Sequence, residues 1–225
     1  MPSSFSNFDS VVKELIQIIH PTSFLDIGCG AGKYGKLVKS IHNNCHTTGI
    51  EIEESYRLQF DIDNIYNDIL IGDAWNIISK DYSKYYDLCI IGDCIEHMKK
   101  STGIDLVNFL VYRTQYIILL IPEFIVQDSV NGIDSESHVS VWNETDFLWH
   151  DRWAWDNAYT ISIFVLRGYQ PSSINFDDLI DSVNERKVFI NDFYSERVLR
   201  PVNLIKKVKA RDDLMDGVRV SFRPQ

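Results

Sequence analysis

Short apolar runs alternate with longer amphipathic stretches through the first half of the chain. The runs end at glycine, aspartate or proline, a pattern typical of parallel strands buried on both faces of a sheet. The stretches between them repeat their apolar positions at helical spacing. The pattern predicts strands over residues 23–27, 47–52, 68–71, 87–91 and 116–121, and helices over residues 9–20, 32–41, 54–61, 75–79 and 101–113.

The pattern weakens past Pro122. Residues 123–140 are mostly polar and predict a long loop, which in a compact domain is usually a lid or a binding loop. Residues 160–166 fit either a strand or the end of a helix that Gly168 terminates. Residues 179–209 fit a helical segment broken at Pro201, and residues 217–222 fit a final strand. We therefore expect one α/β domain with a doubly wound, mostly parallel, seven-stranded sheet and a helical elaboration near the C-terminus.

Composition places the chain among ordinary globular proteins, with 225 residues of which 45% are hydrophobic and 24% charged. Disorder, collagen and a disulfide miniprotein are excluded. No apolar run approaches the length of a membrane span, and the first residues lack the pattern of a signal peptide, so we expect a cytoplasmic protein. The four cysteines form no CxxC pair and are expected to be reduced thiols.

The net charge of -10 argues against a nucleic-acid partner, since such binding depends on neutralising phosphates. The charge is nevertheless uneven, because residues 186–225 hold ten basic and five acidic residues. We interpret this segment as a solvated helix face that covers an acidic body. An anionic-substrate patch is the alternative.

The clearest chemical signal is the run from Asp26 to Gly35 that ends the first predicted strand. Glycines at alternate positions let the backbone turn tightly and approach a ligand where a Cβ atom would collide. The helix that follows directs free N–H groups toward an anionic group. Three further signals follow later strands: Glu51 after the second, Asp73 with Ala74 after the third, and the Asp93-Cys94-Ile95-Glu96-His97 turn after the fourth.

In these features the chain resembles the class I S-adenosylmethionine-dependent methyltransferases over roughly residues 22–125. The resemblance rests on the D-x-G-x-G-x-G loop, the acid ending the second strand, the Asp-Ala pair and the D-x-x-E-H turn. It implies a Rossmann-like fold in which the glycine loop cradles the methionine end of the cofactor and Glu51 holds the ribose. The cofactor-binding residues it implies are Asp26, Gly28, Cys29, Gly30, Gly32, Tyr34, Glu51, Ile52, Asp73, Ala74, Asp93 and Cys94.

A nicotinamide-dependent oxidoreductase is the alternative enzyme, because residues 30–35 also satisfy the dinucleotide pattern G-x-G-x-x-G. An aspartate such as Asp73, taken alone, is more often a turn or helix-cap residue than a ligand residue. Gly28, directly after the strand, and the Glu96-His97 turn favour methyl transfer. A P-loop is excluded, since Tyr34 follows Lys33 where a magnesium-binding hydroxyl is required.

The Asp93-x-x-Glu96-His97 turn also resembles the E-x-x-E-H metal site of ubiquinone-pathway and small-RNA 2'-hydroxyl methyltransferases, with His138 as the distant ligand. Aspartate stands where those families carry glutamate, and we predict a turn without metal. His138 lies in a segment similar to the H-x-x-x-W/F loop of small-molecule and sugar methyltransferases, where it would take the acceptor's proton. The alternative is an exposed histidine beside a helix cap at Ser140 or Asn143. We predict His97 and His138 as the catalytic residues.

The sequence thus predicts methyl transfer from S-adenosylmethionine, to oxygen, on a small polar or sugar-like acceptor. Residues 1–125 would bind the cofactor, and residues 126–225 of the same domain would bind the acceptor. Alternatives are a metal-assisted RNA or quinone-type O-methyltransferase, the oxidoreductase, and a non-catalytic methyltransferase-like module. Four tryptophans within residues 142–155 could form an aromatic platform for a sugar, although such clusters more often belong to the core. No membrane partner is expected, and the oligomeric state is open.

Overall fold

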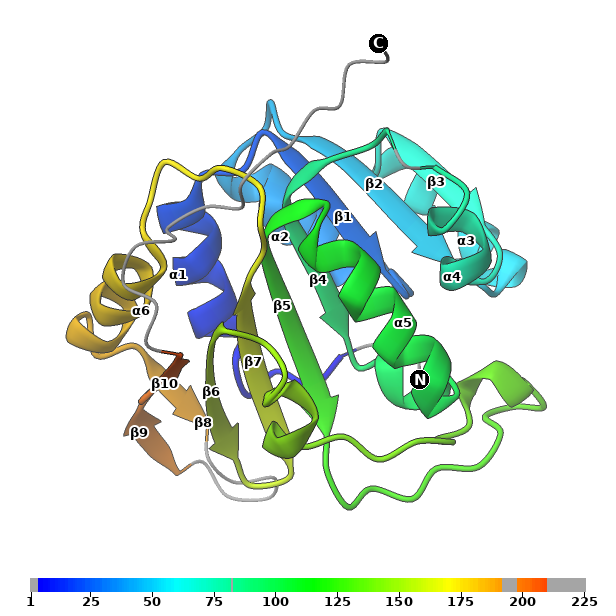
Figure 1. The fold of residues 1–225 in the computed structure, drawn as a ribbon. Helices are drawn as coiled ribbons and strands as arrows, with labels where there is room; N and C mark the ends of the chain where they lie inside the picture. The colour runs from blue at the N-terminus through cyan, green and yellow to red at the C-terminus, as the bar shows by residue number, and fades with distance from the viewer. Residues whose placement is uncertain (1–3, 82, 192–197, 210–225) are drawn as a thin grey trace, which may run out of the picture.

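One sheet of eight strands organises the described part of the protein, in the order β10-β6-β7-β5-β4-β1-β2-β3 (Figure 1). The computed structural model describes residues 4–81, 83–191 and 198–209. The strands from β1 to β5 pair in parallel, whereas β7 is antiparallel to both β5 and β6, and β10 is antiparallel to β6. The strands of the sheet are β1 (Ser23–Ile27), β2 (His46–Glu51), β3 (Asp68–Ile71), β4 (Tyr86–Gly92), β5 (Thr114–Pro122), β6 (Arg152–Ala158), β7 (Ile161–Arg167) and β10 (Ile205–Val208).

Helices cover both faces of the sheet, as the double winding predicts. Two short antiparallel strands, β8 (Phe189–Asn191) and β9 (Leu199–Pro201), pair apart from the sheet. The α-helices are α1 (Asp9–Ile19), α2 (Lys33–Ile41), α3 (Glu54–Gln59), α4 (Ala74–Ile78), α5 (Lys100–Val111) and α6 (Phe176–Glu185). Short 3-10 turns are η1 (Ile62–Asn64), η2 (Ile95–His97), η3 (Asp134–Glu136) and η4 (Glu144–Phe147).

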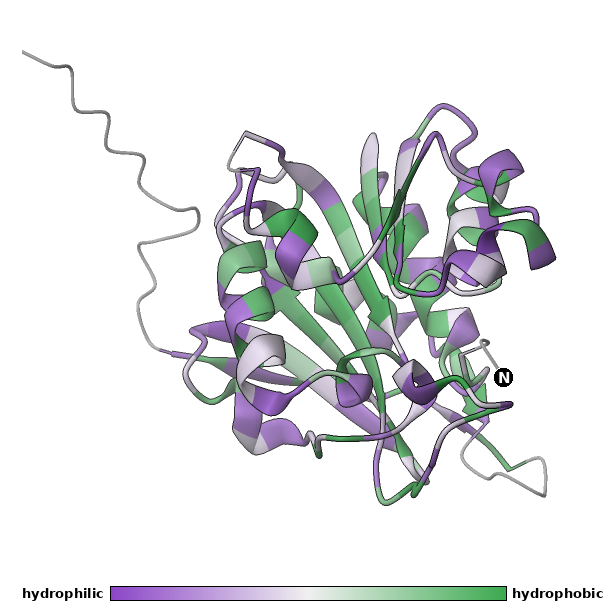
Figure 2. Cartoon of the chain, turned by 90° about the vertical axis from the view of Figure 1, so that its right-hand side faces the viewer, coloured by the Kyte–Doolittle hydropathy of each residue, from purple (hydrophilic) through white to green (hydrophobic). Residues whose placement is uncertain are grey.

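The core has two layers because successive side chains of a strand point to opposite faces. In β5, Ile118 and Leu120 pack with α1, α2 and α6, whereas Ile117 and Leu119 pack with α4 and α5. Figure 2 shows the hydrophobic colour concentrated on the central strands and on the helix faces turned toward them. The continuous apolar runs of the sequence reflect this burial on both sides.

The five strands and five helices predicted before Pro122 are all present, with ends that shift by at most a few residues. The alternatives for residues 160–166 resolve to a strand, β7. The position of β7 between β5 and β6 explains its largely apolar sequence, since every residue of it is buried.

Two predictions for the C-terminal part are wrong. Within the described residues the sheet has eight strands rather than seven, and residues 186–191 and 198–209 are not helical. Helix α6 ends where Lys187 adopts a positive φ of 49°, and Val202 and Leu204 are then buried at strand-like, alternate spacing. Part of the basic C-terminal segment therefore forms β10. The C-terminal elaboration predicted as helical thus combines one helix, α6, with short strands. The strand predicted over residues 217–222 lies outside the described residues.

Candidate functional site

The glycine turn after β1 has the backbone conformation that its sequence predicts. Gly28 and Gly32 have φ angles of 69° and 75°, which side-chain-bearing residues rarely adopt. A Cβ atom on Gly28 would lie 2.3 Å from Cys94 Sγ, and one on Gly32 would lie 2.5 Å from Ile65 Cδ1. Glycine at both positions therefore lets the turn pack directly against its neighbours and frees α2 to begin at Lys33.

A cavity of about 340 Å³ opens at the carboxyl ends of β1, β2 and β4. This is the edge of a doubly wound sheet at which ligands bind. Both predicted catalytic histidines, His97 and His138, line it. Of the predicted cofactor-binding residues, the cavity is lined by Gly28, Cys29, Gly30, Tyr34, Glu51, Ile52, Asp73, Ala74, Asp93 and Cys94.

Asp26 and Gly32 do not line the cavity. Asp26 is buried in β1, where its Oδ2 accepts a hydrogen bond from the Tyr66 hydroxyl at 2.5 Å. Tyr66 in turn accepts one from the Gly35 backbone N–H at 3.2 Å. Burial raises the pKa of Asp26 to about 7, despite the opposing effect of the Tyr66 hydrogen bond. Asp26 in β1 is thus linked through the Tyr66 hydroxyl to Gly35 in α2.

Glu51, the last residue of β2, has a buried carboxylate that binds the backbone of the glycine turn. Its Oε2 accepts a hydrogen bond from Gly30 N–H at 2.8 Å, and its Oε1 accepts one from Glu53 N–H at 3.0 Å. Burial raises the pKa of Glu51, and these two backbone hydrogen bonds oppose that shift. Each carboxylate oxygen has a second lone pair that can accept from a ligand hydroxyl.

Asp73 serves as the helix cap that the sequence left as an alternative. Its Oδ1 accepts a hydrogen bond from Asn76 N–H at 2.8 Å at the start of α4. The residue nevertheless lines the cavity together with Ala74. Capping and ligand contact are compatible here, because the cap uses one carboxylate oxygen.

An N-terminal segment that the sequence analysis missed closes one side of the cavity. Ser4 and Phe5 line it, and Asp93 Oδ2 accepts a hydrogen bond from Phe5 N–H at 2.9 Å. The ammonium of Lys33 donates to the carbonyl oxygens of Phe5 and Ser4 at 2.8 and 3.2 Å. Burial raises the pKa of Asp93 to about 7. Neither Ser4 nor Phe5 belongs to a periodic apolar pattern, so no sequence signal marked this contact.

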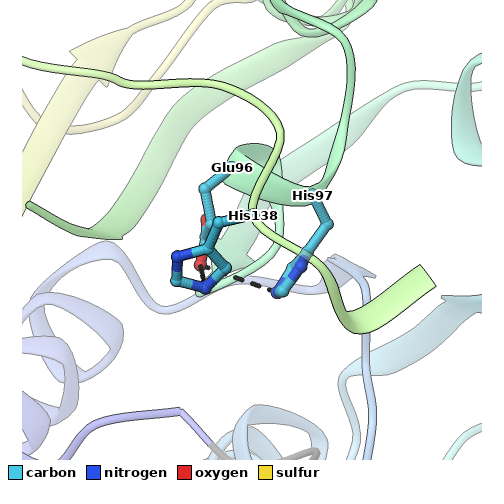
Figure 3. A group of neighbouring side chains, drawn as sticks. All are labelled: Glu96, His97 and His138. Carbon is cyan, nitrogen blue, oxygen red and sulfur yellow. Dashed lines mark ion pairs between the residues drawn. The ribbon is translucent and has the colours of Figure 1, made fainter. Parts of the chain in front are cut away.

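Glu96, His97 and His138 converge on the same cavity from two segments (Figure 3). Glu96 and His97 belong to η2 after β4, and His138 belongs to the loop that follows β5. Glu96 Oε1 lies 3.8 Å from His97 Nε2 and 4.0 Å from His138 Nε2. Burial raises the pKa of Glu96 well above its ordinary value and lowers that of His97. His138 is therefore not the exposed histidine of the capping alternative, since its side chain is 13% exposed.

The loop after β5 is held against the cavity by backbone and side-chain contacts. The N–H groups of Val139 and Ser140 donate to the Glu96 carbonyl at 2.9 and 3.0 Å. Glu136 Oε1 accepts a hydrogen bond from the Tyr56 hydroxyl at 2.7 Å, which links this loop to α3. Tyr56, Gln127 and Glu136 also line the cavity, and the sequence analysis did not single them out. For Gln127 and Glu136, the available sequence signal was the polar character of the loop that contains them.

Two of the four tryptophans within residues 142–155 belong to the core, whereas Trp149 is 40% exposed. Trp142 and Trp153 are each 1% exposed, and both pack against Phe147. Asn143 begins η4 with a capping box that Asp146 completes. The segment therefore fixes the end of the loop that carries His138.

No family model matches the chain. A curated relative, (S)-tetrahydroprotoberberine N-methyltransferase from Eschscholzia californica, is 26% identical over 147 residues, which are 62% of this chain and 37% of that protein. This chain thus matches little more than a third of the relative's length.

Solved structures match over more of the chain. A SAM dependent methyltransferase from Archaeoglobus fulgidus superposes with a TM-score of 0.53 at 16% identity, over 70% of this chain and 93% of that one. The chain has the class I S-adenosylmethionine-dependent methyltransferase fold. The plantazolicin methyltransferase BpumL, solved in complex with SAH, shares this fold with a TM-score of 0.52 at 14% identity, over 72% of this chain and 85% of that one.

This methyltransferase fold departs from the dinucleotide-binding strand order, because antiparallel β7 stands between β5 and β6. All four cysteines are free thiols, as expected. Among the described residues, no helix is both long and apolar enough to cross a membrane.

Proposed function

We propose that this chain binds S-adenosylmethionine in the cavity and transfers its methyl group to an oxygen atom of a small polar or sugar-like acceptor. One observation carries the proposal: the glycine turn, Glu51 and the Asp93–His97 turn, which lie far apart in the sequence, line a single cavity. Residues 1–125 supply the cofactor side of it. The loop that contains Glu136 and His138 supplies the remaining wall.

The charge of the cavity supports a cationic cofactor. Five acidic side chains line it, of which burial favours the neutral form of Glu96, against the two lysines Lys33 and Lys99. The sulfonium of S-adenosylmethionine is positively charged, whereas the pyrophosphate of NAD is negatively charged and would face these acids. The SAH bound in the BpumL structure supports the same ligand class for this fold.

The reaction requires mainly that an acceptor oxygen be held in line with the methyl group. The oxygen attacks the methyl carbon, the carbon–sulfur bond breaks with its electron pair remaining on sulfur, and S-adenosylhomocysteine leaves. The acceptor hydroxyl loses a proton in the process. We assign the activation of this hydroxyl to His97 and His138, whose Nδ1 atoms contact backbone carbonyls and leave Nε2 free.

The direct test is isothermal titration of the purified chain with S-adenosylhomocysteine, with NAD titrated separately. We expect micromolar binding of S-adenosylhomocysteine that Glu51→Ala weakens by more than about tenfold, as the loss of a charge-assisted hydrogen bond implies. The control is Glu54→Ala, which removes an exposed carboxylate three residues away. Binding of NAD without S-adenosylhomocysteine would overturn the proposal.

The acceptor atom needs its own assay. We expect a panel of small hydroxylated acceptors, incubated with S-adenosylmethionine labelled on its methyl group, to yield labelled ethers detectable by mass spectrometry. Exclusive labelling of amines in a parallel panel would refute oxygen as the acceptor while leaving the cofactor assignment intact. Binding without product in any panel would favour the non-catalytic module.

A further inference from the structure

The hydrogen bond between Tyr56 and Glu136 joins two segments of the cavity wall that lie far apart in the sequence. Tyr56 belongs to α3, shortly after the strand that ends in Glu51, whereas Glu136 lies 80 positions further along the chain in η3. Both side chains line the cavity. Figure 1 shows the loop after β5 extending from the central strands toward the side of β2 and α3. Tyr56 thus meets this loop where it reaches the proposed cofactor side.

The contact has a fixed donor and a fixed direction. Burial and the neighbouring Glu136 carboxylate raise the pKa of the Tyr56 hydroxyl, so the hydroxyl keeps its proton and donates it. Tyr56 is 5% exposed, and its ring packs edge-on against Phe60, directly after α3, with 5.5 Å between the ring centres. Packing therefore holds the ring, and the hydroxyl points at Glu136 from a fixed position.

The loop after β5 is attached to the rest of the cavity on two sides. On one side the Glu96 carbonyl of η2 accepts hydrogen bonds from Val139 and Ser140. Among the hydrogen bonds of the described residues, that of Tyr56 is the one that joins residues 123–140 to α3. Removing the Tyr56 hydroxyl would therefore release the α3 side of the loop and leave the η2 side attached.

Glu136 is connected to both proposed catalytic histidines. Its carbonyl accepts a hydrogen bond from Gln127 Nε2 at 2.6 Å, and the Gln127 carbonyl accepts one from His138 N–H at 2.9 Å. The next carbonyl along the chain, that of Ser137, lies 3.1 Å from His97 Nδ1. A displacement of Glu136 thus moves the backbone that carries His138 and the carbonyl that orients His97.

We propose that Tyr56 and Glu136 are positioning residues, whose hydrogen bond holds the loop of residues 123–140 against α3 and thereby sets the imidazoles of His97 and His138 toward the acceptor. The catalytic consequence rests on the proposed function, whereas the contact itself rests on the geometry. Catalysis by proximity and orientation is sensitive to small displacements of the groups that meet the substrate. Loss of the contact therefore lowers the rate of transfer without removing any catalytic group.

The first test observes the ligand-free protein by NMR. Tyr56→Phe removes the hydroxyl and keeps the ring that packs on Phe60. We expect the imidazole signals of His97 and His138 to shift, and solvent exchange of the His138 backbone N–H to quicken by more than about tenfold, because a hydrogen bond to a carboxylate is lost. Tyr112→Phe, at an exposed tyrosine beyond the far end of α5, is the matched control. An exchange rate in Tyr56→Phe equal to that of the parent would overturn the proposal.

The second test distinguishes positioning from a general effect on the fold. With an acceptor that the labelling panel identifies, Tyr56→Phe should lower kcat by more than about tenfold and change the KM for S-adenosylmethionine by less than about threefold. Glu136→Gln keeps a side-chain oxygen that accepts from Tyr56 and should retain more activity than Glu136→Ala. Equal losses in the two Glu136 variants would contradict a role for this hydrogen bond.

Titration of the same samples with S-adenosylhomocysteine keeps the two proposals apart. The exchange measurement needs no ligand. Faster exchange in Tyr56→Phe without binding of S-adenosylhomocysteine would refute the proposed function and support the contact between α3 and the loop. Binding of S-adenosylhomocysteine without any change in exchange would refute the positioning role alone.

Discussion

The carboxylate of Glu51 accepts a hydrogen bond from the backbone N–H of Gly30 at 2.8 Å. The acid at the end of β2 thus holds the glycine turn after β1, in addition to facing the cavity. Glu51→Ala should accelerate amide hydrogen exchange of Gly30 by more than about tenfold, because the N–H loses its buried acceptor. Exchange measured by NMR in the ligand-free protein tests this. An unchanged rate would mean that the turn is rigid without Glu51.

The buried Asp26 should make stability depend on pH. Burial raises its pKa to about 7 in the folded state, so the folded protein holds the proton more tightly than the unfolded chain does. The stabilisation is full below the unfolded pKa near 4 and is lost as the pH rises through about 7, at up to about 1.4 kcal/mol per pH unit. Asp26→Asn should therefore gain stability relative to the parent between pH 5 and pH 7.

Urea unfolding at several pH values measures this difference. Asp105→Asn, which neutralises an exposed acid on α5, serves as the control for a general charge effect. Parallel stability curves for the parent and Asp26→Asn would show that the carboxyl group ionises freely in the fold.

Lys33 should govern how firmly the N-terminal segment covers the cavity. Lys33→Met keeps the apolar stem but removes the donors to the carbonyls of Ser4 and Phe5. We expect S-adenosylhomocysteine to dissociate several-fold faster in stopped-flow measurements, since loosening a closing segment acts mainly on release. Lys39→Met, at the other end of α2, should leave the rate unchanged. Equal dissociation rates in Lys33→Met and Lys39→Met would show that the N-terminal segment does not help to close the cavity.

Trp142 should contribute to stability rather than to acceptor binding. It is 1% exposed, stacks with Phe147, and donates from Nε1 to Ser140 Oγ at 2.8 Å. Trp142→Ala should cost about 3–5 kcal/mol of unfolding free energy. Trp149→Ala, at a site 40% exposed, should cost less than about 1 kcal/mol. Chemical denaturation tests both. Unchanged stability together with lost acceptor binding would restore the aromatic-platform interpretation.

The first half of the fold was predictable because its signals are local. Runs such as residues 116–121 are buried on both faces, so hydrophobicity alone marks them as strands. The glycine turn and Glu51 were predictable for a similar reason, because each directly follows a strand whose end reaches the same edge. Asp73 shows the limit of this reasoning, since a cap and a ligand residue carry the same sequence signal.

The second half depended on contacts that sequence patterns do not encode. Val202 and Leu204 are buried by packing against elements far away in the chain, which overrides a sequence that permits a helix. The meeting of His138 with Glu96 and His97 likewise depends on where a long loop folds back. The family resemblance had already grouped His138 with this turn, while the distances between the three side chains required the structure.

The basic stretch acquires a different role once it is placed at β10. Lys206 forms ion pairs with Asp181 and Asp177 of α6 at 2.9 and 3.3 Å, so these two carboxylates of the same protein largely balance its positive charge. In the described part of the chain β10 is the last strand of the sheet, and its neighbour Lys207 is exposed. Lysines on such a strand oppose the addition of a strand from another molecule. The segment considered as an anionic-substrate patch therefore places lysines where they disfavour edge-to-edge association of sheets.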